Sequence, residues 1–185
     1  MKTAIFGGTF DPIHSAHLRV AHEAADFMKL ERIVFVPAGN PPHKHAGTPF
    51  DDRFHMLELA CAEDARFEVS RIEEGNAKSY SIHTIERLKR PGEFLYFIIG
   101  ADAFSELETW HRWKEVIQAV EFIVAARPGH VIAAPVGARI YRLETLAMDV
   151  SSSEIRHRIL RGEMPADVPV KVAEYIRAHG LYHDQ

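Results

Sequence analysis

Four mainly apolar runs divide the chain, and each ends at or within two residues of a glycine or proline. They cover residues 2–6, 32–37, 94–100 and 121–126. Runs that are apolar at every position, rather than at every second position, are typical of strands covered by helices on both faces of a parallel sheet. A weaker strand is predicted at 67–70 and a last one at 138–143.

The segments between these runs carry apolar residues at helical spacing, which predicts helices in alternation with the strands. The predicted helices cover 13–28, the region of Arg53 to Cys61 with a cap at Asp51 or Asp52, a helix capped by Ser81, a helix capped by the serines at 151–153, and 168–179. This alternation indicates an α/β fold with a doubly wound parallel sheet. We expect one domain over residues 1–185, with ligands bound beyond the carboxyl ends of the strands.

Composition narrows the class of protein. The 185 residues carry a formal net charge of −4 with histidine neutral, which gives no basic field for nucleic acid. No apolar stretch is long enough to cross a bilayer, and no signal peptide is recognised. The single cysteine, Cys61, cannot form an internal disulfide and is interpreted as a buried small residue. We therefore expect a cytoplasmic protein, either a monomer or a small homo-oligomer.

The candidate chemistry begins where the first strand ends. Gly7 and Gly8 break the strand, and a helix then starts with His14 and His17, which are three residues apart and share one face of it. Free N–H groups and the dipole at a helix N-terminus attract anions, so the pattern indicates a phosphate site. It matches neither the dinucleotide-binding fingerprint nor the P-loop. The alternative is a capping turn with two exposed histidines.

A second helix start has similar chemistry near the end of the chain. Ser151, Ser152 and Ser153 offer hydroxyl and N–H groups, and Arg156 follows within the first turns, where its guanidinium can bind phosphate in a forked geometry. An ordinary N-cap needs only one serine. The two helix starts therefore predict two anion cradles that face each other.

Two of these segments resemble the signatures of a known superfamily. Residues 7–17, Gly-Gly-Thr-Phe-Asp-Pro-Ile-His-Ser-Ala-His, are similar to the GG-[ST]-FDP-x-HxGH motif of nucleotidyltransferases, and residues 150–156, Val-Ser-Ser-Ser-Glu-Ile-Arg, are similar to its ISSTxIR motif. Five further segments narrow the match to bacterial nicotinate mononucleotide adenylyltransferases: 39–44, 79–81, 100–102, 110–111 and 127–129. The resemblance covers nearly the whole chain and implies a Rossmann-like fold.

The resemblance implies transfer of the adenylyl group of ATP to nicotinate mononucleotide, which gives deamido-NAD and pyrophosphate. It implies a direct in-line attack and Mg²⁺ carried on the ATP phosphates rather than held by a metal site of the protein. The implied catalytic residues are His14, His17 and Arg156. The implied ATP-binding residues are Gly7, Gly8, Thr9, Phe10, His14, His17, Gly100, Asp102, Arg127, Ser151, Ser152, Ser153 and Arg156. The implied binding residues for the mononucleotide are His43, Lys44, Thr84, Trp110 and His111.

Each of these assignments has a plainer structural alternative. Asp102 could cap a helix over 103–107, Arg127 could be a surface charge, and the loop that carries His43 and Lys44 could simply be solvated. Trp110 would stack on the pyridine ring, whereas Trp113 is expected in the core. Three positions depart from the family pattern, which has glycine at Ala16, aspartate at His83 and tyrosine at His111.

Three other functions fit parts of the sequence. A sister transferase could use nicotinamide mononucleotide or phosphopantetheine as the phosphate acceptor. A non-catalytic nucleotide-binding protein could keep the cradle without the chemistry, an idea that Ala16 suggests. A metal-binding protein could use the histidines, although no nearby carboxylate or thiolate completes a ligand set with His14 and His17.

Overall fold

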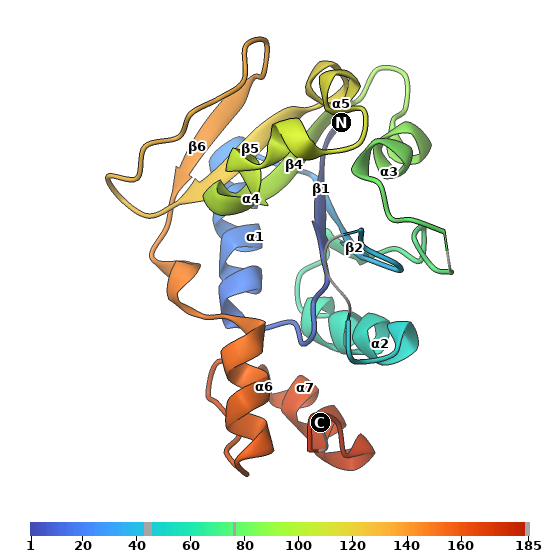
Figure 1. Ribbon diagram of the computed structural model, residues 1–185, viewed down its shortest axis with the longest axis vertical. Helices are drawn as coiled ribbons and strands as arrows, with labels where there is room; N and C mark the ends of the chain where they lie inside the picture. The colour runs from blue at the N-terminus through green and yellow to red at the C-terminus, as the bar shows by residue number, and fades with distance from the viewer. Residues whose placement is uncertain (43–45, 76, 184–185) are drawn as a thin grey trace.

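The computed structural model describes residues 1–42, 46–75 and 77–183, and its strands form one parallel sheet in the order β3-β2-β1-β4-β5-β6 (Figure 1). The strands are β1 Lys2–Gly8, β2 Arg32–Pro37, β3 Phe67–Val69, β4 Phe94–Gly100, β5 Glu121–Ala126 and β6 Ile140–Glu144. Every neighbouring pair is parallel. The predicted doubly wound α/β sheet is confirmed. Its strand order reverses between β1 and β4, where such folds bind ligands.

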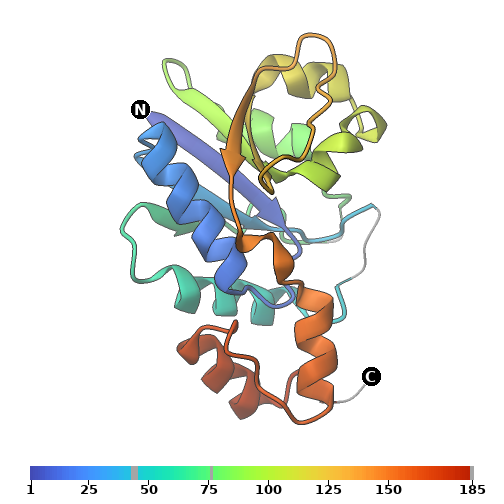
Figure 2. The ribbon, with the colours of Figure 1, turned by 90° about the vertical axis from the view of Figure 1, so that its left-hand side faces the viewer.

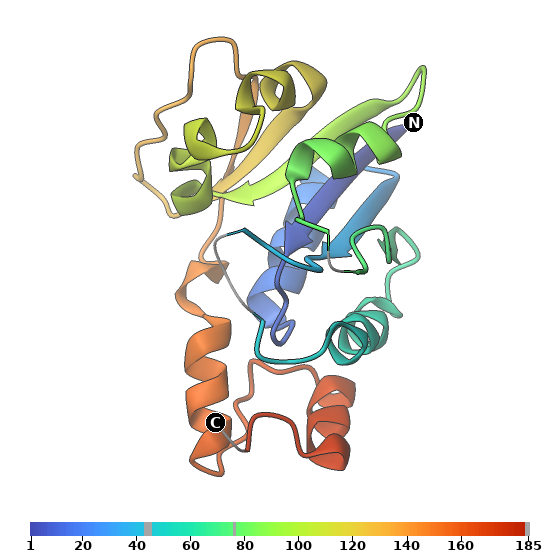
Figure 3. The same cartoon turned by 45° about the vertical axis from the view of Figure 1, so that its right-hand side comes forward.

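Helices cover both faces of the sheet (Figures 2 and 3). They are α1 Ser15–Met28, α2 Phe50–Cys61, α3 Ser81–Leu88, α4 Ala101–Ser105, α5 Trp113–Ala119, α6 Ser152–Leu160 and α7 Val170–His179, with 3₁₀ turns η1 Leu107–Thr109 and η2 Ala147–Asp149. One face packs on α1 and α2, and buried residues of α6 and α7 join the same core. The other face packs on α3, α4 and α5.

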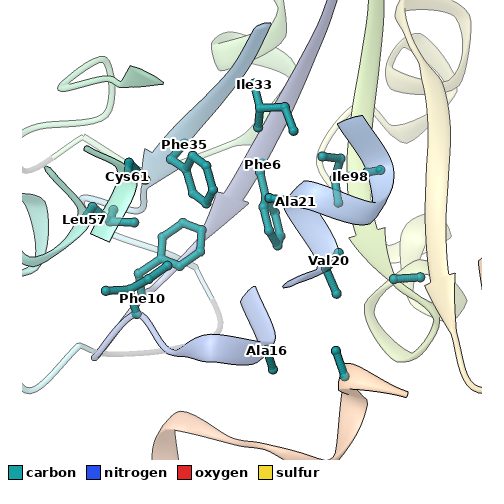
Figure 4. Packing of buried hydrophobic residues seen from close by; sticks show 14 of the residues in the cluster. Phe6, Phe10, Ala16, Val20, Ala21, Ile33, Phe35, Leu57, Cys61 and Ile98 are labelled. Carbon is teal, nitrogen blue, oxygen red and sulfur yellow. The ribbon is translucent and has the colours of Figure 1, made fainter. Parts of the chain in front are cut away.

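The continuous apolar runs are explained by this two-sided burial. Ile33 and Phe35 belong to the core beneath α1, whereas Val34 and Val36 belong to the core beneath α3 to α5. Successive side chains of a strand point to opposite faces, so a strand covered on both sides needs apolar residues at every position. Figure 4 shows the first core, where the rings of Phe10 and Phe35 lie 5.8 Å apart.

The last two helices lie beyond the end of the sheet towards which β1 runs (Figure 1). α6 carries Ile155 and Ile159 into the first core, and α7 packs against α2. The backbone N–H of Ser15 donates a hydrogen bond to the carbonyl of Asp167 at 2.7 Å, which joins this C-terminal region to the start of α1. The closing segment of the chain therefore sits beside the predicted site.

Several predicted boundaries were wrong by a few residues. α2 is preceded by Pro49, so Asp51 and Asp52 lie in its first turn instead of capping it. α3 starts at Ser81 itself, after Tyr80. Carboxylates in the first turn still stabilise a helix through its dipole. Aspartate is therefore common both at the N-cap and in the first turn, and the sequence pattern alone does not separate the two positions.

The other differences lie in the second half of the chain. α4 begins at Ala101 with Gly100 as its N-cap, so the alternative in which Asp102 caps a helix over 103–107 is wrong. β6 starts two residues later than predicted, and α7 starts at Val170 after Pro169. Cys61 is buried, as predicted, and Trp113 packs partly buried against the second core. Among the described residues no helix has the length and apolarity to span a bilayer.

Candidate functional site

A cavity of 610 Å³ lies at the carboxyl ends of β1 and β4, between the N-termini of α1 and α6; we call it the helix-end cavity. The two helix starts that the sequence singled out therefore face one space, as predicted. The predicted residues that line it are Gly8, Thr9, Phe10, His14, His17, Gly100, Ser151, Ser152, Ser153 and Arg156. Ala16, which replaces the family's glycine, lines it as well.

The turn between β1 and α1 shapes the floor of this cavity. Phe10 adopts a left-handed backbone with φ of 49°, and its ring is buried against Phe6 and Phe35. A Cβ atom at Gly8 would lie 3.0 Å from the Phe10 ring, so a larger residue at this position would displace the ring. Glycine at position 8 thus leaves room for the Phe10 ring, which packs in the core and fixes the position of the turn. Asp11 and His14, which follow, line the cavity.

His14 and His17 stack at the start of α1, with ring centroids 3.7 Å apart and planes inclined by 23°. The backbone N–H of His14, the N-cap residue, donates to Nδ1 of His17 at 3.3 Å. An Nδ1 that accepts a hydrogen bond leaves the proton of a neutral imidazole on Nε2. The local backbone therefore sets His17 as an Nε2–H donor.

Both imidazoles are held in the neutral form by burial. Burial lowers the pKa of His14 to about 4, against a smaller upward influence from Asp167. Burial and the neighbouring His14 together lower the pKa of His17 well below its usual range. Nδ1 of His14 is inaccessible to solvent and makes no hydrogen bond of normal geometry among the described residues, although the backbone N–H of His17 faces the His14 side chain in a capping box.

The start of α6 is tied directly to the turn before α1. The Ser152 hydroxyl donates to the carbonyl of Pro12 at 2.9 Å, and Nη1 of Arg156 donates to the carbonyl of Asp11 at 2.8 Å. The Ser151 hydroxyl accepts the backbone N–H of Glu154, which makes Ser151 the N-cap. The Ser153 hydroxyl accepts from Nη2 of Arg156 at 3.3 Å, so the three serines do more than cap a helix.

Two buried charged residues of this region escaped the sequence analysis. Arg53 is 1% exposed and donates to the carbonyls of Thr9 and Thr48 at 2.7 and 3.1 Å. Asp11 is 3% exposed and accepts from the backbone N–H groups of Gly47 and Thr48. Asp11 lies inside the glycine-rich motif at residues 7–17, and its position there could have indicated that it belongs to the site. Nothing in the pattern around Arg53 distinguishes it from a solvated helix residue.

A second cavity, of 290 Å³, lies on the other side of the β1 end; we call it the loop cavity. The predicted residues that line only this cavity are Gly7, Thr84 and Trp110. It shares three predicted residues with the helix-end cavity, namely Gly8, Thr9 and Gly100. Trp110 packs its ring edge-on to Phe97, with centroids 5.8 Å apart. Two predicted subsites therefore adjoin at the end of β1.

Glu73 organises the wall of the loop cavity, and the sequence analysis missed it. The Thr84 hydroxyl donates to its carboxylate, and Ser79 and the backbone N–H of Gly39 also contribute hydrogen bonds. Burial raises the pKa of Glu73, opposed by these hydrogen bonds. A Cβ at Gly39 would lie 1.8 Å from the Glu73 carbonyl oxygen, so only glycine allows these two loops to meet.

Three further predicted residues, all of them described, do not line either cavity. Arg127 is exposed and pairs with Asp149 at 2.7 Å, at the entrance to α6. Asp102 is exposed in the first turn of α4. His111 is also exposed, with its ring 4.4 Å from that of Tyr80. His43 and Lys44 lie outside the described residues.

The chain is similar to known proteins over nearly its whole length. Residues 5–158 match the cytidylyltransferase-like family. A probable nicotinate-nucleotide adenylyltransferase from Solibacter usitatus is 53% identical, with 99% of this chain and 100% of the relative covered. One from Geobacter metallireducens is 38% identical, with 100% of both chains covered.

The solved structures that resemble the fold include a nicotinic acid mononucleotide adenylyltransferase from Plasmodium falciparum complexed with NaAD. It superposes with a TM-score of 0.79 at 20% identity and covers 98% of this chain and 97% of that one. At this identity the likeness concerns the fold alone. From the full-length sequence identity, the chain belongs to the nicotinate-nucleotide adenylyltransferase family.

Proposed function

We propose that this chain transfers the adenylyl group of ATP to nicotinate mononucleotide and releases pyrophosphate, forming deamido-NAD. The observation that carries the proposal is the meeting of two anion-binding helix starts, those of α1 and α6, in one cavity that adjoins a smaller pocket bearing Trp110 and Thr84. Full-length relatives named for this activity support it.

The residues of the helix-end cavity suit the triphosphate of ATP. Backbone N–H groups at the two helix starts, the serine hydroxyls and the Arg156 guanidinium would bind its oxygens. His17 would donate from Nε2 to the reacting α-phosphate, and His14 would form a hydrogen bond with another phosphate oxygen. Predicted roles for Asp102, Arg127, His43, Lys44 and His111 also remain part of the proposal.

The loop cavity would hold the pyridine end of the mononucleotide. Trp110 offers an aromatic face for stacking, and the acid group of the ring would lie near Thr84 and His111, as the family resemblance implies. The mononucleotide phosphate would then lie near the shared residues Gly8 and Thr9, next to the helix-end cavity. That arrangement brings the attacking oxygen close to the α-phosphorus.

The chemistry would be a single displacement. An oxygen of the mononucleotide phosphate forms a bond to the α-phosphorus while the bond to the bridging oxygen of pyrophosphate breaks. No side chain needs to act as a nucleophile, because positioning and stabilisation of phosphate charge supply the catalysis. In a single displacement the configuration at phosphorus inverts, whereas a covalent adenylyl-enzyme would give retention.

Magnesium would enter with ATP. Among the described residues there is no group of three or more histidine, cysteine, aspartate or glutamate side chains that could hold a metal. Both oxygens of Asp11, the carboxylate that lines the helix-end cavity, already accept hydrogen bonds. Mg²⁺ commonly keeps its waters and binds to substrate phosphates. A cytoplasmic location and a monomer or small homo-oligomer remain predictions.

The test is incubation with ATP labelled at the α-phosphate and either nicotinate or nicotinamide mononucleotide, with products separated by chromatography. We expect labelled deamido-NAD from the acid and less product from the amide. Faster turnover of nicotinamide mononucleotide would instead identify a sister transferase. Tight ATP binding without transfer to either acceptor would identify a non-catalytic nucleotide-binding protein. An α-thiophosphate analogue of ATP tests inversion.

A further inference from the structure

Tyr182 follows the last helix and turns back towards the catalytic region. Its side chain is 8% exposed, and its backbone is left-handed with φ of 65°. Residues with a Cβ rarely adopt this conformation. Immediately before it, Leu181 donates its backbone N–H to the carbonyl of Ile176, which closes α7. The chain therefore reverses at the end of α7 and places a phenol inside the protein.

The phenol hydroxyl meets the carboxylate of the glycine-rich turn. It donates to Oδ1 of Asp11 at 2.6 Å, and the Thr48 side chain also hydrogen bonds with the phenol. Oδ2 of Asp11 accepts the backbone N–H of Gly47 at 3.1 Å. Burial and the neighbouring Asp11 raise the pKa of Tyr182 well above its usual range, so the phenol keeps its proton and remains a donor.

Asp11 stands where a free negative charge would harm the proposed reaction. It lines the helix-end cavity, and its own carbonyl accepts Nη1 of Arg156 at 2.8 Å. A carboxylate that lost a donor would compete with phosphate for the Arg156 guanidinium, because an arginine–carboxylate pair is a strong charge-assisted contact. The hydrogen bond from Tyr182 satisfies Oδ1 of Asp11.

We propose that Tyr182 is a positioning residue for adenylyl transfer, because its hydroxyl occupies the Asp11 carboxylate and so leaves Arg156 free for the phosphates of ATP. The inference rests on the proposed function and extends it to a residue that is far from the two helix starts in sequence. Tyr182 itself does not line either cavity.

The test compares Tyr182→Phe with Tyr175→Phe. Tyr175 is a matched control, because it lies on α7 and its hydroxyl donates to Asp52 at 2.7 Å, away from the turn. We expect Tyr182→Phe to lower kcat about tenfold, the scale of a small misplacement of a catalytic group. KM for nicotinate mononucleotide should stay within about twofold, because the loop cavity does not change. Tyr175→Phe should keep the wild-type kcat.

A double-mutant cycle with Arg156→Lys identifies the route of the effect. If Tyr182 acts through Arg156, adding Tyr182→Phe to Arg156→Lys lowers kcat by less than about twofold. An unchanged kcat in Tyr182→Phe, or the same loss in both backgrounds, would overturn the proposal. An inactive wild-type protein would instead refute the proposed function. If Tyr182→Phe does not fold, Thr48→Val weakens the same phenol contact: a lower kcat supports the proposal, and an unchanged kcat contradicts it.

Discussion

The helix-end cavity and the loop cavity adjoin at the end of β1, yet they are built differently. The first is formed by two helix starts, whose backbone N–H groups and serine hydroxyls come from short continuous segments. The second is formed where the loops after β2 and β3 meet α3, joined by the buried carboxylate of Glu73. Binding groups supplied by a helix end follow from local sequence, whereas those supplied by meeting loops depend on the fold.

Burial has the same consequence in both cavities. It lowers the pKa of His14 to about 4 and raises the pKa of Glu73, so each group is biased towards its neutral form. Before ATP binds, the positive potential of the helix-end cavity therefore comes from Arg156 and the helix dipoles rather than from imidazolium charge. The following variants test the difference between the helix-end cavity and the loop cavity, from the largest expected effect to the smallest.

Replacing His17 with alanine removes the Nε2–H donor from the helix-end cavity. We expect kcat to fall at least about a hundredfold, equivalent to roughly 2.7 kcal/mol of transition-state stabilisation. Steady-state kinetics with both substrates measures it. His22→Ala is the control, because His22 lies on the same helix and faces Asp64 at the surface. Near-normal turnover of folded His17→Ala would remove His17 from the catalytic role.

The neutral state of His14 predicts a loss of stability in acid. Its folded pKa of about 4 lies below the ordinary histidine pKa of 6.5. Below pH 6.5 protonation therefore favours the unfolded chain, until the folded residue also titrates near pH 4. From pH 6.5 to pH 5 this residue alone should cost about 1.5 kcal/mol of unfolding free energy. Urea unfolding of wild type and His14→Asn measures it. Equal slopes against pH would contradict the assignment.

Trp110→Ala tests the aromatic wall of the loop cavity. Loss of stacking should raise KM for nicotinate mononucleotide about tenfold, since stacking on an aromatic side chain contributes on the order of 1–3 kcal/mol. KM for ATP should change little, because Trp110 lines only the loop cavity. Trp110→Phe keeps an aromatic face and should recover most of the affinity. Equal increases in both KM values would break the distinction between the cavities.

Glu73→Gln gives the smallest expected effect. A neutral amide accepts the Thr84 hydroxyl less strongly than a carboxylate, and its NH₂ group opposes the N–H of Gly39. We expect KM for the mononucleotide to rise about threefold with an unchanged KM for ATP. The control is Glu74→Gln, a neighbour that is exposed and pairs with Arg71. An effect of Glu74→Gln as large as that of Glu73→Gln would show that surface charge is responsible.

The sequence by itself determined the fold class and the helix-end cavity. Continuous apolar runs require a sheet buried on both faces, and the segments at 7–17 and 151–156 carry their phosphate-binding groups within a few residues. Such features depend on local geometry, namely the pleat of a strand and the free N–H groups of a helix start. For that reason the order of residues along the chain is enough to predict them.

Only the tertiary structure decided which polar residues are buried and what they contact. Glu73 and Glu74 are adjacent and chemically alike, but one lies beneath two loops and the other pairs with a surface arginine. Tyr182 meets Asp11 across 171 positions of sequence. Burial and long-range hydrogen bonds depend on how separate segments pack together, and that packing leaves no periodic signal in the residues themselves.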